Sequence, residues 1–250
     1  MYSAFHTKLD SPRFLTLVQR EKVIKDGLGD REGAVRAAAS KLIMKWFDFA
    51  LAEAPNEQVG TWLGDDGGIM RALIRYLELF DVIGGEQIAL DALNAIFVIK
   101  PDYLDAFTFT GEKFWLIGCC HTLSLSCIDD YWATLTPESA FLARVFVLNC
   151  RGSARVDDAG LPMVTAFAFY IQALYNGLLE TLQVAESVQT LHETEEETEM
   201  LDELFKIASI LSSMLSIATG LDYSDEVGRR KAFSVVSECW FQIQASFLDF

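Results

Sequence analysis

The feature that most constrains the fold is a polar turn at residues 29–33 that separates two stretches with helical apolar spacing. The apolar stretch before the turn ends at Leu28. After the turn, apolar residues recur every three or four positions, which places them on one face of a helix: Val35, Ala38, Ala39, Leu42, Ile43, Trp46 and Phe47. Asp30 is placed to cap this second helix. The segment therefore predicts a helical hairpin with one buried face.

This hairpin resembles the inner turn of a HEAT repeat, a helical pair that stacks on its neighbours to form a solenoid. Small residues such as Ala39 let paired helices approach closely, and Asp30 and Arg36 can make polar contacts between stacked repeats. We therefore predict structural roles in the turn for Asp30, Val35, Arg36 and Ala39.

The rest of the chain has many helix boundaries and few strand signals. Thr136-Pro137-Glu138 offers a cap, a proline at the first helical position and an acid in the first turn. Ser224 is expected to cap a last helix, whose inward stripe would be Phe233, Val236, Trp240, Ile243 and Phe247. We predict an all-α fold, an α-solenoid (superhelix) of about five HEAT-type helical hairpins. It would form one segment over residues 1–250, with a flexible loop at residues 151–160.

The charge distribution limits where a polyanion could bind. The net charge is −16, which makes the chain as a whole a poor binder of polyanions. Residues 1–50 carry nine Lys and Arg against six Asp and Glu. Residues 156–205 contain eleven acids and no Lys or Arg, so this stretch would repel a phosphate backbone.

One uncharged stretch, residues 160–179, is long enough to resemble a membrane span. It contains Pro162, Gln172 and Asn176 and has no basic flanks, so we predict a buried helix and no membrane contact. The N-terminus has no apolar segment typical of a signal peptide. We interpret the five cysteines, an odd number, as reduced residues of an intracellular protein.

The histidines give no sign of a metal site or a catalytic site. His6 and His192 have no ligand partner at metal-site spacing. The cluster Cys119-Cys120-His121 is weak, because adjacent residues of a helix point in different directions. The chain also lacks the G-x-S-x-G, H-E-x-x-H and P-loop patterns. We therefore predict no catalytic residue, no metal and no cofactor.

Several segments together resemble the condensin complex subunit 3 (CAP-G) family, and they follow the family's order. They are residues 11–46, residues 135–146 leading into 161–183, and residues 221–233 (LDYSDEVGRRKAF). The last is the most specific, because its acid pair, glycine and double arginine are not general solenoid residues. Family members are several times longer, so the chain resembles a middle section of such a subunit.

The resemblance implies a non-catalytic HEAT-repeat scaffold in mitotic chromosome condensation. Its expected partners are the kleisin subunit, the rest of the condensin complex and double-stranded DNA, the DNA mainly through flanking repeats. The expected location is the nucleus and chromosomes, with a cytoplasmic phase in the cell cycle. An armadillo/HEAT-type adaptor that binds peptides in transport or signalling is the alternative, and residues 221–233 distinguish the two.

Two basic patches and one aromatic group are the candidate contact residues. Those for the DNA backbone are Arg20, Lys22, Lys25, Lys41 and Lys45, and also Arg229, Arg230 and Lys231. Solvated faces are the alternative for the first patch, and internal pairing with Asp225 or Glu226 for the second. The candidates for a partner peptide are Phe107, Phe109, Phe114 and Trp115, with a local plug of the solenoid as the alternative.

Overall fold

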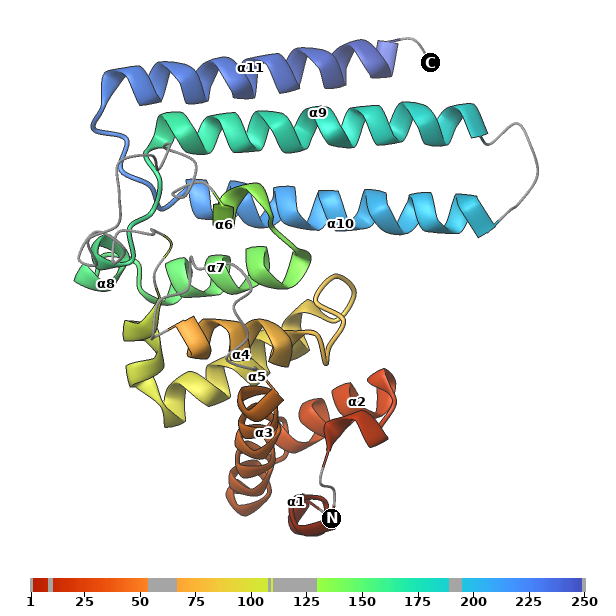
Figure 1. Cartoon of the computed structure of the whole chain (residues 1–250), viewed down its shortest axis with the longest axis vertical. Coiled ribbons are helices and arrows are strands. Elements are labelled where there is room, and N and C mark those ends of the chain that lie inside the picture. The colour runs from red at the N-terminus through yellow and green to blue at the C-terminus, as the bar shows by residue number, and fades with distance from the viewer. Residues whose placement is uncertain are drawn as a thin grey trace, which may run out of the picture. The chain divides into compact units, whose positions relative to one another are not determined.

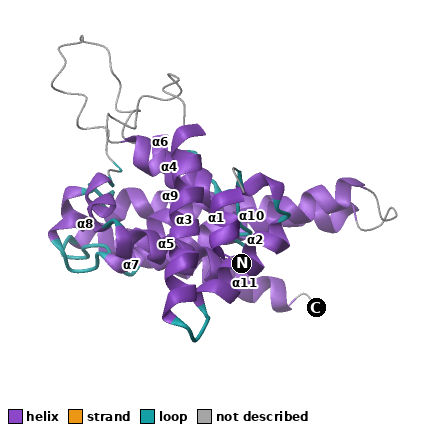
Figure 2. Cartoon of the chain, turned by 90° about the horizontal axis from the view of Figure 1, so that it is seen from below, coloured by secondary structure: helices purple, strands orange, loops and turns teal. Residues whose placement is uncertain are grey.

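The computed structural model of the chain describes residues 2–8, 11–53, 67–107, 109, 130–188 and 195–248. Every regular element within these ranges is a helix, and no strand is drawn among them (Figure 2). The all-α class predicted from the sequence is therefore confirmed.

The helices are labelled in Figure 1. Their bounds are α1 Tyr2–Lys8, η1 Pro12–Phe14, α2 Leu17–Leu28, α3 Gly33–Glu53, α4 Gly67–Leu77, α5 Glu86–Ile99, η2 Pro101–Ala106, α6 Asp130–Ala133, α7 Pro137–Asn149, α8 Ala154–Asp158, α9 Val164–Val188, α10 Glu195–Ala218 and α11 Glu226–Leu248. The two short elements marked η are 3-10 helices.

The chain divides into two compact units. Unit 1 consists of residues 1–131 and 152–159, and unit 2 consists of residues 132–151 and 160–250. Because residues 152–159 return to unit 1, the chain passes between the units three times.

Unit 1 is built around α3, which contacts α1, α2, α4 and α5. The periodic apolar face predicted for α3 is the buried one, and it includes Ala39, Leu42, Ile43, Trp46 and Phe47. Apolar side chains of α4 and α5 complete this core: Met70, Leu73, Tyr76, Leu77, Leu93, Ile96 and Phe97. The helical hairpin predicted around residues 29–33 is thus confirmed, with α2 and α3 in contact.

The helices α1, α2 and α3 meet at Gly27. A Cβ atom built on Gly27 would lie 2.6 Å from the Cβ of Ala39 and 2.8 Å from the ring of Tyr2. The hydroxyl of Tyr2 donates a hydrogen bond to the carbonyl oxygen of Val23 at 3.1 Å. A side chain at position 27 would separate the helices, so the absence of a Cβ permits this close approach.

Unit 2 is built from the long helices α9, α10 and α11 together with α7. Helix α9 lies between α10 and α11, and α10 also contacts α7 (Figure 1). Thr136 caps α7, with Pro137 at the first helical position, as the sequence predicts. The core includes Phe141, Phe146, Phe167, Met214 and Ile217. Among the described helices, including α9 with its uncharged first half, none has the length and apolarity needed to cross a membrane.

Two predictions for α11 are wrong. Asp225 and not Ser224 caps the helix, because its Oδ2 accepts a hydrogen bond from the backbone N–H of Gly228 at 2.7 Å. Phe233 and Val236, predicted to face inward, are 70% and 60% exposed. At the contact with α9, a Cβ atom built on Gly228 would lie 3.1 Å from the Cβ of Val164, so this glycine lets the two helices approach closely. Val235 is also buried. The side chains of Trp240, Ile243 and Phe247 lie outside the described part of the chain.

Residues 151–160, predicted to be a flexible loop, include the helix α8. Arg155 of α8 forms an ion pair with Asp105, and the backbone N–H of Phe109 donates to the carbonyl of Ala159 at 2.8 Å. These contacts tie the segment to unit 1. Its flexibility stays a prediction.

Candidate functional site

The turn between α2 and α3 is closed by Asp30 and Arg36. The Asp30 Oδ1 accepts a hydrogen bond from the backbone N–H of Glu32 at 2.8 Å. The Nη1 of Arg36 donates to the carbonyl oxygens of Asp30 at 2.7 Å and Arg31 at 2.9 Å. We expected these two side chains to link stacked repeats. Among the described residues their hydrogen bonds stay within the turn, and they fix the angle at which α3 begins.

The same arrangement recurs before α11 in unit 2. The Nη1 of Arg229 donates to the carbonyls of Tyr223 at 2.6 Å and Ser224 at 2.8 Å. Arg36 and Arg229 are each the fourth residue of their helix, and each reaches back five and six residues. The recurrence of this turn could have been predicted from the sequence. Its signal is an arginine at the fourth position of a helix that follows a turn containing an aspartate.

An aspartate supports each of these turns. Asp222 accepts from the backbone N–H of Ser224, as Asp30 does from Glu32. The pKa of the Asp222 carboxyl is lowered, because the backbone N–H and then the hydroxyl of Ser224 donate to its charged form. Asp222 therefore remains ionised at neutral pH and keeps its role in the turn.

Replacing Arg36 with alanine is expected to lower the free energy of unfolding by about 1 kcal/mol, because two charge-assisted hydrogen bonds to turn carbonyls are lost at an exposed site. Arg229→Ala should have an effect of the same size. Urea unfolding measures both. Arg31→Ala is the matched control, because no hydrogen bond of its exposed side chain occurs among the described residues. Equal losses for Arg31→Ala and Arg36→Ala would contradict the role of Arg36.

The first basic patch separates into one internal residue and four lysines. The Nε of Arg20 donates to the carbonyl of Leu79 at 2.7 Å, and its Nη1 donates to that of Leu15 at 2.8 Å. Arg20 therefore holds α2 in place. Lys22, Lys25 and Lys41 are exposed, and Lys45 is half-buried. Each pair, on α2 and on α3, is about one helical turn apart.

The second basic patch is engaged within unit 2. The Nζ of Lys231 donates to Gln172 at 3.1 Å and lies 4.4 Å from the ring centroid of Phe169 on α9. Arg230 forms an exposed ion pair with Glu226 at 2.6 Å. Arg229 closes the turn described above. The Arg230–Glu226 pair is one of the internal pairings that the sequence left open as an alternative to DNA contact. Arg229 and Lys231 contact groups that are not acids. DNA contact by this patch stays a prediction.

The aromatic candidates are divided between the core and the part of the chain that is not described. Phe107 and Phe109 are buried and lie in a row of rings with Phe97 and Tyr131, at centroid distances of 5.1–6.3 Å. They plug the core of unit 1, which was the alternative to a peptide site. Phe114 and Trp115 lie outside the described residues.

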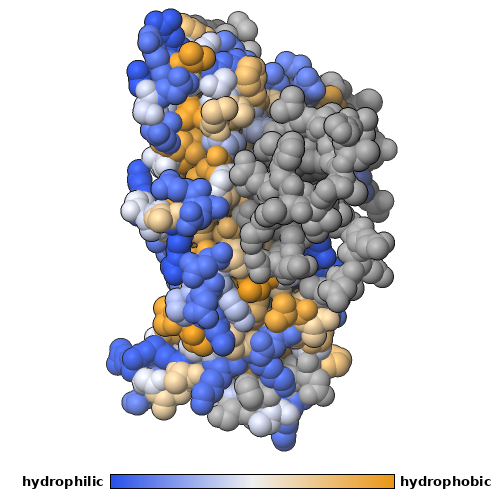
Figure 3. Space-filling view, turned by 60° about the vertical axis from the view of Figure 1, so that its left-hand side comes forward, coloured by the Kyte–Doolittle hydropathy of each residue, from blue (hydrophilic) through white to orange (hydrophobic). Residues whose placement is uncertain are grey.

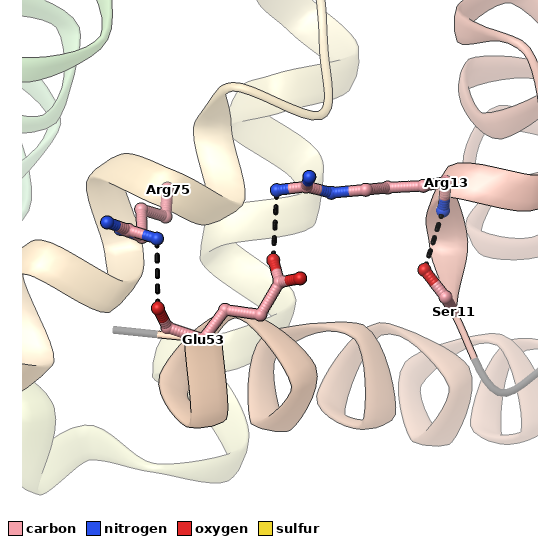
Figure 4. A network of polar contacts seen from close by, with 4 residues as sticks. All are labelled: Ser11, Arg13, Glu53 and Arg75. Atoms are coloured by element: carbon pink, nitrogen blue, oxygen red, sulfur yellow. Dashed lines mark hydrogen bonds and ion pairs between the residues drawn. The ribbon is translucent and has the colours of Figure 1, made fainter. Parts of the chain in front are cut away.

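One polar network was not predicted by the sequence. Glu53, at the end of α3, accepts a hydrogen bond from Arg13 of η1 through its carboxylate at 2.9 Å (Figure 4). Its backbone carbonyl accepts from the Nη1 of Arg75 on α4, also at 2.9 Å. The end of α3 is thus joined to two elements that lie far from it in the sequence.

The described residues contain no group of three or more His, Cys, Asp or Glu side chains that could hold a metal ion. The cluster Cys119-Cys120-His121 and the residue His192 lie outside these residues. Cys150 and Cys239 are free thiols. Burial raises the pKa of the Cys239 thiol, and nearby Glu238 adds to this effect.

The fold and its turns define a class of protein: an all-α chain of packed helical hairpins, of the HEAT type. A solved structure, the S. pombe condensin Cnd3–Cnd2 subcomplex, has the same fold with a TM-score of 0.64 and 22% sequence identity. The match covers 95% of this chain and 25% of that one. The α-solenoid prediction is confirmed by this likeness.

Sequence comparison leads to a particular subunit. No family model matches the chain. Condensin complex subunit 3 of Schizosaccharomyces pombe is 26% identical over 233 residues, that of Xenopus laevis 27% over 232, and that of Homo sapiens 26% over 232. These matches cover 92%, 90% and 90% of this chain, and 20%, 18% and 19% of the relatives. The resemblance to condensin complex subunit 3 is therefore confirmed, and the chain spans about one fifth of the length of these relatives.

Proposed function

We propose that this chain is a non-catalytic HEAT-type scaffold segment of a condensin complex and that it acts in chromosome condensation. The observation that carries the proposal is the match to condensin complex subunit 3 along nine tenths of the chain. Residues 221–233, the most specific part of the resemblance seen in the sequence, favour this function over a peptide-binding adaptor, which has no reason to carry them. Such a scaffold would act on chromosomes in the nucleus and be cytoplasmic for part of the cell cycle.

The proposed protein partner is the kleisin subunit. The S. pombe structure with the same fold is a complex of Cnd3 with Cnd2, which supports a partner of that kind for this chain. Co-expression of the full 250-residue chain with the kleisin subunit of the same organism tests the proposal. We expect the two to co-purify through size-exclusion chromatography. Separate elution at micromolar concentrations would contradict it.

The proposed DNA contact is made by the lysines of α3. Lys41 is exposed, and Lys45 follows one helical turn later, so the two can follow one phosphate backbone. They lie in the part of the sequence where basic residues outnumber acidic ones. Contact by Lys22 and Lys25 stays a prediction from the sequence. Flanking repeats would supply most of the remaining positive charge.

Reversing both charges, K41E/K45E, is expected to weaken binding of the kleisin-bound chain to duplex DNA about tenfold at low salt and to reduce the salt slope by about 2. A gel shift across a salt series measures both quantities. The matched control is K100E/K206E, which makes the same change in net charge at other positions. An equal loss in the control would show a general charge effect and would contradict a local contact by Lys41 and Lys45.

A further inference from the structure

The segment formed by η1 and α2 combines exposed apolar side chains with lysines. Phe14 and Val18 are 76% and 72% exposed. Lys22 and Lys25 follow Val18 by four and seven residues, so the three lie on one side of the helix. We call Phe14, Val18, Lys22 and Lys25 the α2 stripe. Apolar side chains also reach the surface over α9 to α11 (Figure 3), but there nothing in the structure indicates what covers them.

The orientation of α2 is fixed by contacts on its other side. Arg20 donates to the carbonyl of Leu79, and the carboxylate of Glu21 accepts from the backbone N–H of Asp81 at 3.0 Å. Ile24 is buried in the core. A capping box between Thr16 and Gln19 fixes the start of the helix. The stripe is thus held toward solvent before any partner arrives, which lowers the entropy cost of binding.

The start of the stripe is held in the same way. Arg13, next to Phe14, is bound to Glu53 at the end of α3 (Figure 4). Ser11 caps η1 by accepting from the backbone N–H of Arg13 at 3.2 Å. Phe14 is therefore an exposed residue of a short helix. The cap by Ser11 holds the start of this helix, and its end leads into α2.

The charge of the stripe selects an anionic partner. The side-chain ammonium groups of Lys22 and Lys25 make no hydrogen bond or ion pair with any described residue. The acids nearest along α2 are Glu21, which is bound to Asp81, and Asp26, which lies beside the stripe. These two neighbouring ammonium groups, which have no partner among the described residues, are complementary to the carboxylates of a bound polypeptide.

The apolar residues of the stripe favour a polypeptide over DNA. A phosphate backbone gains little from a phenylalanine and a valine, whereas covering each of them with apolar side chains of a partner is favourable. An amphipathic helix of a partner can cover Phe14 and Val18 with one face and present acids to Lys22 and Lys25 from its edge.

We propose that the α2 stripe binds an acidic amphipathic helix of a partner protein. The apolar face of that helix covers Phe14 and Val18, and its carboxylates pair with Lys22 and Lys25. The proposal is independent of whether this partner belongs to a condensin complex.

Fluorescence anisotropy of the full chain with a labelled peptide tests this inference. The probe is a synthetic 18-residue helix with leucine at positions i, i+3, i+4 and i+7 of each repeat and glutamate on its other face. We expect F14S/V18S to weaken binding at least tenfold, and K22E/K25E to weaken it similarly and to remove its salt dependence. Circular dichroism of both variants should match that of the wild type, because all four side chains are exposed. If F14S/V18S does not fold, the binding of the peptide by K22E/K25E still tests the proposal.

The controls have matched substitutions at other exposed positions. V98S/F241S changes two exposed apolar residues, and K100E/K206E changes the charge equally. Both should bind the peptide within twofold of the wild type. Absence of binding by the wild type, or equal binding by the stripe variants, would overturn the proposal. It would also be overturned if the F14S/V18S change reduced binding to a 24-base-pair duplex or to phosphatidylserine vesicles instead of the peptide.

Discussion

Replacing Phe47 with alanine should lower the free energy of unfolding by about 3–5 kcal/mol. The ring is buried where α3 meets α4 and η2. It lies edge-on to Tyr76 at a centroid distance of 6.2 Å and tilted against Tyr103 at 5.5 Å. Truncation would leave a cavity between helices that are held on several sides and could collapse only partly. Urea unfolding followed by circular dichroism measures the loss.

Phe233→Ala is the matched control for this experiment. The same atoms are removed, but Phe233 is 70% exposed on α11, so we expect a change within about 0.5 kcal/mol. This pair of variants also tests the orientation of α11, because the sequence places Phe233 on the inward stripe. A loss at Phe233 equal to that at Phe47 would contradict the orientation of α11 in the structure.

Gly27→Ala should destabilise unit 1 by about 1–3 kcal/mol, although alanine favours an isolated helix over glycine by about 1 kcal/mol. The added methyl group would lie 2.6 Å from the Cβ of Ala39, which cannot rotate away, and 2.8 Å from the Tyr2 ring. The helices α2 and α3 would have to separate. Hydrogen exchange at the amides of both helices, together with urea unfolding, measures the effect.

Gly177→Ala provides the opposite expectation within another helix. Gly177 lies inside α9, and a Cβ there would meet nothing within 4 Å. Because no contact opposes the added methyl group, only the higher helix propensity of alanine affects stability. We therefore expect stabilisation by about 0.5–1 kcal/mol. If Gly27→Ala stabilised the chain, as Gly177→Ala is expected to do, the close approach at Gly27 would be contradicted.

Local signals in the sequence predicted local structure well. The cap at Thr136 with its proline, and the inward face of α3, depend on residues a few positions apart, and the structure has them where they were predicted. The same reasoning failed for α11. Periodicity identifies an apolar stripe, but it does not say which side of the helix meets a neighbour. In α11 Gly228 lies against Val164 and Thr165 of α9 and Val235 is buried, whereas Phe233 and Val236 are exposed.

Contacts between distant residues could not be predicted from the pattern. Arg13 and Glu53 are 40 positions apart, and nothing in either segment indicates the other. Arg20 and Lys231 appeared to be basic surface residues, yet each is engaged by a group brought near by packing. A charged side chain in a sequence shows which partners it can accept. Only the fold shows whether one is already within reach.

The path of the chain between the units limits how this molecule can be divided by evolution or by genetics. A gene fragment that ends after residue 131 would lose α8, and with it the acceptor for the N–H of Phe109 and the ion-pair partner of Asp105. A fragment that begins at residue 132 would carry α8 without the elements that α8 binds. No single breakpoint therefore separates the two units with all of their contacts kept.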